Sequence, residues 1–109
     1  MEHFQRVAER IAFAADKMKK TNLVDTPNLL CDVYAFEPGQ TQAAHRHAVG
    51  DKLYYVVAGC GRIRVGDDER TVAAGDLVCA PGGSEHGVEN PGPERLTLLV
   101  VMAPKPSRA

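Results

Sequence analysis

Three of the four histidines in this chain stand at a spacing that suits a metal site. His45 and His47 are separated by one residue, so on a β-strand both imidazoles point to the same face, with attachment points about 6.5 Å apart. His86 follows a turn at residues 81–85 and begins a segment that can lie beside the first pair. Three facing imidazoles suit iron, zinc, nickel, manganese or copper. On spacing alone, an exposed His-x-His pair with His86 at a turn is the plainer alternative.

The elements that must position these histidines are expected to be short β-strands. The chain contains 10 glycines and 7 prolines, and they mark turns at intervals that hold one short strand each. Such a series favours an antiparallel sandwich or barrel over alternating strands and helices. The expected strands cover residues 29–37, 42–47, 52–58, 62–65, 69–73, 77–80, 86–89 and 95–102.

The N-terminal segment allows two interpretations. Apolar side chains from Phe4 to Met18 recur at helical spacing, which predicts a helix somewhere in residues 2–19. Ile11, Phe13 and Ala15 also alternate, which leaves edge strands at 10–14 and 21–24 open. We therefore divide the chain into three parts. These are a helical or extended wrapper at residues 1–24, a β-barrel domain at 25–103, and an extended, largely solvated tail at 104–109.

Two segments resemble the paired motifs of the cupin superfamily. The stretch from Gly39 to Gly59 resembles the first motif, GxxxxxHxHxxxxExxxxxxG, and the stretch from Gly75 to Asn90 matches the second, GxxxxxPxGxxHxxxN. The resemblance implies an all-β, antiparallel jelly-roll barrel of a small single-domain cupin, with both motifs forming hairpins at one open mouth. It also implies that the three histidines of the two motifs, His45, His47 and His86, are ligands of a divalent transition metal.

One position departs from the first motif. Lys52 stands where the family carries its metal-binding Glu, and Asp51 precedes it. A protonated amine has no lone pair to donate to a metal. Three arrangements stay open: the histidines hold the metal alone while Lys52 pairs with Asp51 or an anionic ligand, Asp51 serves as a fourth ligand, or the metal is weak or absent and the pocket binds a small anion. Tyr54 shares the strand parity of Lys52, so it is a further pocket candidate.

Two classes of function follow from this site. The first is a metal-dependent cupin that acts on or binds a small organic molecule, with either dioxygenase-like chemistry on iron or isomerase-like chemistry on a redox-inert metal. The second is a non-catalytic cupin that binds a small anion with weak or no metal. Lys52 is the candidate general base only if its pKa falls close to neutrality.

Composition and charge limit the classes of partner that we expect for this chain. The chain has 109 residues, enough for one domain, and 13 basic against 14 acidic residues give a net charge of -1, which disfavours nucleic acid. It contains no apolar run of membrane-spanning length and no signal-peptide pattern at its start, so we expect no membrane partner and a cytoplasmic location. Its three cysteines lack a CxxC spacing and are expected to be reduced. The apolar strand at 95–102 or the N-terminal segment is the expected contact of a homodimer.

Overall fold

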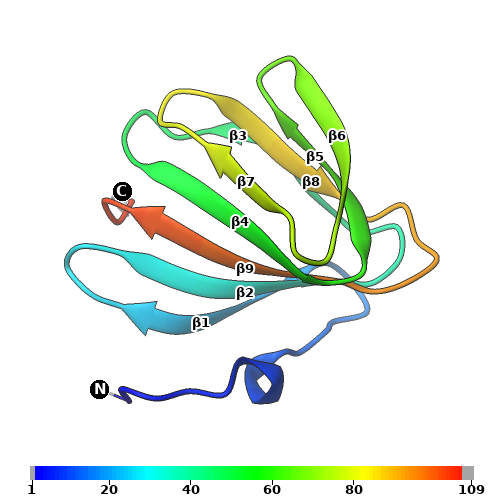
Figure 1. Cartoon of the computed structure of the whole chain (residues 1–109), viewed down its shortest axis with the longest axis horizontal. Coiled ribbons are helices and arrows are strands. Elements are labelled where there is room, and N and C mark those ends of the chain that lie inside the picture. Colours follow the sequence, from blue (N-terminus) through cyan, green and yellow to red (C-terminus); the bar gives the residue numbers. More distant parts are fainter. Residues whose placement is uncertain (1, 107–109) are drawn as a thin grey trace.

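The computed structural model describes residues 2–106, which form two antiparallel β-sheets that face each other (Figure 1). The five-stranded sheet has the order β1 (Lys19–Asp25), β2 (Leu30–Phe36), β9 (Leu96–Ala103), β4 (Asp51–Ala58), β7 (Leu77–Ala80). The four-stranded sheet has the order β3 (Thr41–Arg46), β8 (Glu85–Glu89), β5 (Cys60–Val65), β6 (Asp68–Ala73). The all-β, antiparallel jelly-roll prediction is confirmed, although within residues 2–106 no ladder joins the two sheets into a closed barrel.

Each of the eight predicted strands corresponds to an observed one, from β2 to β9. The predictions succeed because turn residues stop the strands at positions where other residues do not fit. Gly59, between β4 and β5, has a φ of 84°, and a Cβ atom there would lie 2.1 Å from the carbonyl oxygen of Arg95. Only glycine tolerates that conformation and that approach.

The core lies between the two sheets and follows the period-two alternation of the strands. Along β4 the buried positions are Lys52, Tyr54 and Val56, while the residues between them face outward and are exposed or half-buried. The apolar side chains that fill the interior are Tyr34, Phe36, Tyr54, Val56, Ile63, Val72, Ala80, Val88, Leu96, Leu98 and Val100. The same alternation therefore carries one lysine into the interior.

The N-terminal segment contains one short 3-10 helix, η1 (Val7–Arg10), and no longer helix up to Met18. It contacts β1 and the β2–β3 loop instead: Arg10 donates to the carbonyl of Asn22 at 3.0 Å, and the carbonyl of Ala14 accepts from Gln40 at 2.8 Å. The expectation of a longer helix is thus corrected, because tertiary hydrogen bonds outweigh helix propensity here. Of the two alternative edge strands, 21–24 is realised within β1, and 10–14 is not a strand.

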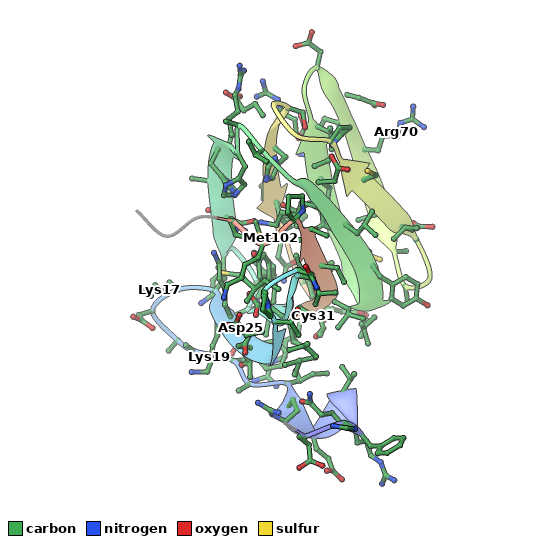
Figure 2. All side chains as sticks on the ribbon, turned by 90° about the vertical axis from the view of Figure 1, so that its left-hand side faces the viewer. Lys17, Lys19, Asp25, Cys31, Arg70 and Met102 are labelled. Carbon is green, nitrogen blue, oxygen red and sulfur yellow. The ribbon has the colours of Figure 1, made fainter. Side chains whose placement is uncertain are left out.

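The structure modifies both ends of the expected barrel domain. Residues 19–24, assigned to the wrapper, belong to the five-stranded sheet as part of β1. Figure 2 shows Lys17 on the loop that leads into this strand and Lys19 where the strand begins, at the other end of the view from Arg70 on β6. In the tail, Lys105 donates its backbone N–H to Asn28 at 3.2 Å and pairs its ammonium with Asp25, so this residue is held against the β1–β2 turn. Residues 107–109 of the predicted tail lie outside the described residues.

Within residues 2–106 no helix has the length and apolar character needed to cross a membrane.

Candidate metal centre

The three histidines predicted from spacing lie together. His45 on β3 is directly opposite His86 on β8, and His47 follows the end of β3. Ring centroids are 4.3 Å apart for His45 and His86, 4.9 Å for His45 and His47, and 5.7 Å for His47 and His86. One ring nitrogen of each histidine lies within 4.8 Å of the other two, which suits ligation of a single metal ion.

Backbone carbonyls orient two of the rings. The Nδ1 atom of His45 lies 3.0 Å from the carbonyl oxygen of Ala43, and that of His86 lies 3.1 Å from the carbonyl oxygen of Ser84. A carbonyl only accepts hydrogen bonds, so each Nδ1 carries the proton and each Nε2 keeps its lone pair. The Nε2 atom of His86 is buried and has no hydrogen-bond partner among the described residues. Leaving such an acceptor unpaired costs about 1–3 kcal/mol, and a metal would satisfy it.

All three imidazoles are disposed to be neutral at pH 7. Burial lowers the pKa of His86 to about 4, with the neighbouring histidines and Lys52 adding to the effect. Burial also lowers the pKa of His45 and His47, and the ammonium groups of Lys52 and Lys20 act in the same direction. Neutral imidazole is the form that binds metals. The donor set therefore fits a transition metal.

Lys52 lies inside the barrel, with 2% of its surface exposed. Its Nζ atom is 4.9 Å from the ring centroid of Tyr34 and 5.1 Å from that of Tyr54. Burial lowers the pKa of Lys52 to about 7; the ammonium of Lys20 lowers it further, and the carboxylate of Asp32 opposes the shift. Lys52 therefore has the near-neutral pKa that it needs to act as a general base.

Asp51 does not join the histidines. Its Oδ1 atom accepts a hydrogen bond from the backbone N–H of Gly82 at 2.9 Å, and its side chain is on the opposite face of β4 from Lys52. Of the open alternatives, the pairing of Lys52 with Asp51 is not among the ion pairs of residues 2–106, and Asp51 is not in the cluster of possible ligands that the described residues form. Asp51 instead holds the turn that leads into β8 and so supports the position of His86.

We expect Asp51→Ala to weaken this support. Losing a charge-assisted hydrogen bond at an exposed site should lower the free energy of unfolding by about 1 kcal/mol, and the looser turn should reduce metal affinity by up to about tenfold. Urea unfolding and calorimetric titration with Zn²⁺ measure the two effects. Asp67→Ala, at an exposed aspartate in the β5–β6 turn, is the matched control. Equal effects of the two substitutions would contradict a specific role for Asp51.

Tyr54 also lies at the site, as its parity with Lys52 predicts. Its ring centroid is 6.2 Å from that of His86, and its hydroxyl donates to Oε1 of Gln42 at 3.4 Å. Burial raises the pKa of Tyr54 and raises that of Tyr34 to about 12, so both phenols stay protonated at neutral pH.

Sequence reasoning missed three residues around this amine: Lys20, Asp32 and Tyr34. Asp32 and Tyr34 share one face of β2, so alternation within the predicted strand at 29–37 could have suggested them. Lys20 could not be found in this way, because its segment was assigned to the wrapper. Its Nζ atom lies 5.1 Å from the centroid of the Tyr34 ring only because β1 pairs with β2 in the observed register.

Comparison with known proteins agrees with this geometry. Residues 32–102 match the sequence pattern of a family described as "Cupin domain". The chain is 36% identical over 80 residues to an uncharacterized protein of Streptomyces coelicolor, covering 73% of this chain and 74% of that protein. It is 29% identical to a protein of Thermotoga maritima named "Oxalate-binding protein", covering 60% of this chain but only 54% of that relative. A crystal structure of a Thermus thermophilus protein superimposes with a TM-score of 0.92 at 37% identity, covering 94% of this chain and 98% of that one.

Proposed function

The chain belongs to the cupin family, and from this premise we propose that His45, His47 and His86 hold one divalent transition metal at which a small organic molecule binds. The observation that carries the proposal is the convergence of the three rings, with Nε2 of His86 buried and unpartnered among the described residues. Iron, zinc, nickel, manganese and copper all accept imidazole ligands. Three ligands leave open positions for a substrate or water, as catalytic metal sites require.

A bound metal would supply Lewis acidity toward a carbonyl or carboxylate and, if it were iron, redox chemistry. The chain's own residues would do the rest. Nδ1 protons held by Ala43 and Ser84 keep the rings oriented, and the buried wall of Tyr34 and Tyr54 limits access of water. The Lys52 amine, with a pKa of about 7, is placed to accept or donate a proton. These roles suit either a dioxygenase-like or an isomerase-like reaction.

We infer that the ligand is a small organic acid. Lys52 and Lys20 bring their amines to 4.9 Å and 5.1 Å from the centroid of the Tyr34 ring, and the carboxylate that acts on Lys52 is that of Asp32. A relative that is 29% identical to this chain over 65 residues is named for binding oxalate, which supports a carboxylate ligand here. The cytoplasmic location expected from the sequence stays a prediction.

The alternative is a non-catalytic cupin that binds an anion with little or no metal. It is favoured by Lys52 itself, because an amine replaces the carboxylate that the first cupin motif would provide. A cavity of about 660 Å³ between the N-terminal segment and β3 is lined by three lysines, Lys17, Lys19 and Lys20, and by one acidic residue, Asp16, so its lining has an excess of basic groups.

Metal analysis separates the two functions. Protein purified without an affinity tag should contain close to one equivalent of a transition metal, or acquire it on reconstitution after chelator treatment. Oxalate, added to protein with and without metal and followed by calorimetry, should bind more tightly to the loaded protein. Less than about a tenth of an equivalent after reconstitution, with unchanged oxalate binding, would favour the anion-binding alternative.

We also propose a homodimer through the outer face of the five-stranded sheet. Leu53, Tyr55 and Leu77 are 37%, 44% and 64% exposed, and in the strand register Tyr55 is opposite Leu77 on one side and Leu99 on the other. A second copy of the chain would cover this continuous, uncharged apolar surface. The predicted strand at 95–102 contributes to it through β9.

Light scattering at micromolar concentration should give twice the monomer mass for the unmodified chain and the monomer mass for Leu77→Lys. The control is Val49→Lys, at a loop residue that is 70% exposed and lies outside the sheet. A monomeric unmodified chain, or dissociation by both substitutions alike, would contradict the proposed interface.

A further inference from the structure

The interior amine of Lys52 has an environment that metal binding does not explain. Its side chain starts opposite Met102 and Ala80, and its Nζ atom reaches the aromatic faces of Tyr34 and Tyr54. Within residues 2–106 it forms no ion pair within 4.0 Å. A buried lysine without a close ion-pair partner is costly as an ammonium and is better accommodated as the neutral amine.

A second amine reinforces this preference. The Nζ atom of Lys20 lies 5.1 Å from the centroid of the Tyr34 ring, the same ring that Lys52 approaches to 4.9 Å. The one carboxylate that acts on Lys52 is Asp32, and its Oδ1 atom already accepts a hydrogen bond from Asn22 at 2.9 Å. Desolvation and a neighbouring cation are the two means by which proteins turn lysine into a nucleophile.

We propose that Lys52 is a carbonyl-reactive amine that condenses with a small aldehyde or ketone, preferentially a 2-oxo acid, to form an imine inside the barrel. The lone pair of Nζ attacks the carbonyl carbon, and the carbonyl π electrons move to the oxygen. The carbinolamine then loses that oxygen with the two amine protons as one molecule of water, which leaves the C=N bond. No oxidant or reductant is consumed. Lys20 supplies the cation for the carboxylate of a 2-oxo acid, which is why this class is preferred.

The condensation goes beyond the proposed function and does not require the metal. The pKa of Lys52, about 7, supports it, because a large share of the amine is then unprotonated at neutral pH. The titratable groups that surround this amine are Lys20 from β1, Asp32 and Tyr34 from β2, Tyr54 from β4, and His45, His47 and His86 from the side of β3 and β8. A metal at the histidines would be one more cation and would lower the pKa of Lys52 in the same direction as Lys20.

Reductive trapping tests the proposal on metal-free protein. The chelator-treated chain is incubated with pyruvate and sodium cyanoborohydride at pH 7, and the adduct is located by peptide mapping. Lys52 should be labelled at least about tenfold more than Lys17, Lys19 and Lys105, because these three side chains lie outside the barrel interior and lack the desolvated surroundings that activate a lysine. Labelling should be lost in Lys52→Arg, which keeps the charge without the nucleophile.

Lys20→Met tests whether the charge of Lys20 acts on Lys52, because a purely structural role of Lys20 would not change the pH dependence of labelling. Removing this neighbouring charge should shift the pH at which Lys52 is half-maximally labelled upward, so labelling falls at pH 7 and recovers in alkali. Peptide mapping of the unmodified chain decides the matter even if a variant fails to fold. Labelling confined to the other lysines, or an unshifted pH profile in folded Lys20→Met, would overturn the proposal. Because no metal is present, this failure is distinct from a failure of the proposed metal site, which the metal analysis tests.

Discussion

His86→Ala is expected to abolish tight metal binding. The substitution removes the most buried of the three imidazoles, whose Nε2 atom is buried and has no hydrogen-bond partner among the described residues. Loss of an outer-shell partner lowers metal affinity roughly 10- to 100-fold. The loss in affinity for Zn²⁺ or Co²⁺ should be larger here, because a direct ligand is removed. Titration calorimetry and the visible absorption of the Co²⁺ form measure the change directly.

Thermal unfolding gives an independent measurement of the same loss. A metal that binds only the folded chain raises the unfolding temperature, and the rise should disappear in His86→Ala. His3→Ala is the matched control, since His3 is exposed and lies outside the cluster. Because the pKa of His86 is already lowered to about 4, protons should compete with the metal for this ligand only well below the ordinary histidine range. Unchanged affinity in His86→Ala would exclude this site as the metal centre.

Lys52→Met is expected to stabilise the metal-free protein at neutral and acidic pH. The native chain buries this amine with 2% exposure and lowers its pKa from 10.5 to about 7. At one pKa unit per roughly 1.4 kcal/mol, and allowing for the favourable contacts with two tyrosine rings, the gain should be about 2–4 kcal/mol. Replacing a buried charge by an apolar side chain of similar length accounts for the direction.

The pH dependence of this gain has a defined sign. Between pH 7 and pH 10.5 the unfolded chain holds the Lys52 proton and the folded chain does not, so the stability of the unmodified protein rises with pH. The difference between Lys52→Met and the unmodified chain should therefore be constant below about pH 7 and shrink toward zero near pH 10. Urea unfolding at pH 6, 8 and 10 measures it.

Lys17→Met, at an exposed lysine of the N-terminal loop, controls for the loss of a positive charge. Its effect on stability should be small at every pH, because the side chain is solvated in both states. A destabilised Lys52→Met at pH 6, or a difference from the unmodified chain that does not change with pH, would show that the amine is not desolvated in the folded protein.

Much of the fold was predictable because its signals are local. Turn glycines and prolines limit each strand, and the observed ends of β2 to β9 lie within two residues of the predicted ones. The N-terminal segment was not predictable in the same way. Its helical spacing competes with hydrogen bonds to Asn22 and Gln40, which are distant in sequence and become available only once the sheet has formed.

The candidate site likewise has a part that local sequence signals predict and a part that depends on tertiary contacts. Alternation predicted that His45 and His47 share a face and that Lys52 and Tyr54 share another, and the resemblance of the second motif placed His86 beside them. By contrast, nothing local indicated that Asp51 holds the turn at Gly82, since a residue's hydrogen-bond partner across 31 positions depends on how the strands meet.

The sequence by itself therefore determined the strand segments, the face on which each histidine lies, and the presence of an amine where a metal-binding carboxylate is expected. The tertiary structure alone decided what surrounds that amine. It brings Lys20 and Tyr34 from β1 and β2 to Lys52 on β4, although β9 separates β2 from β4 in the sheet. The direction of a side chain follows from the two-residue period of its own strand, whereas its neighbours follow from the order and register of strands that are far apart in the chain.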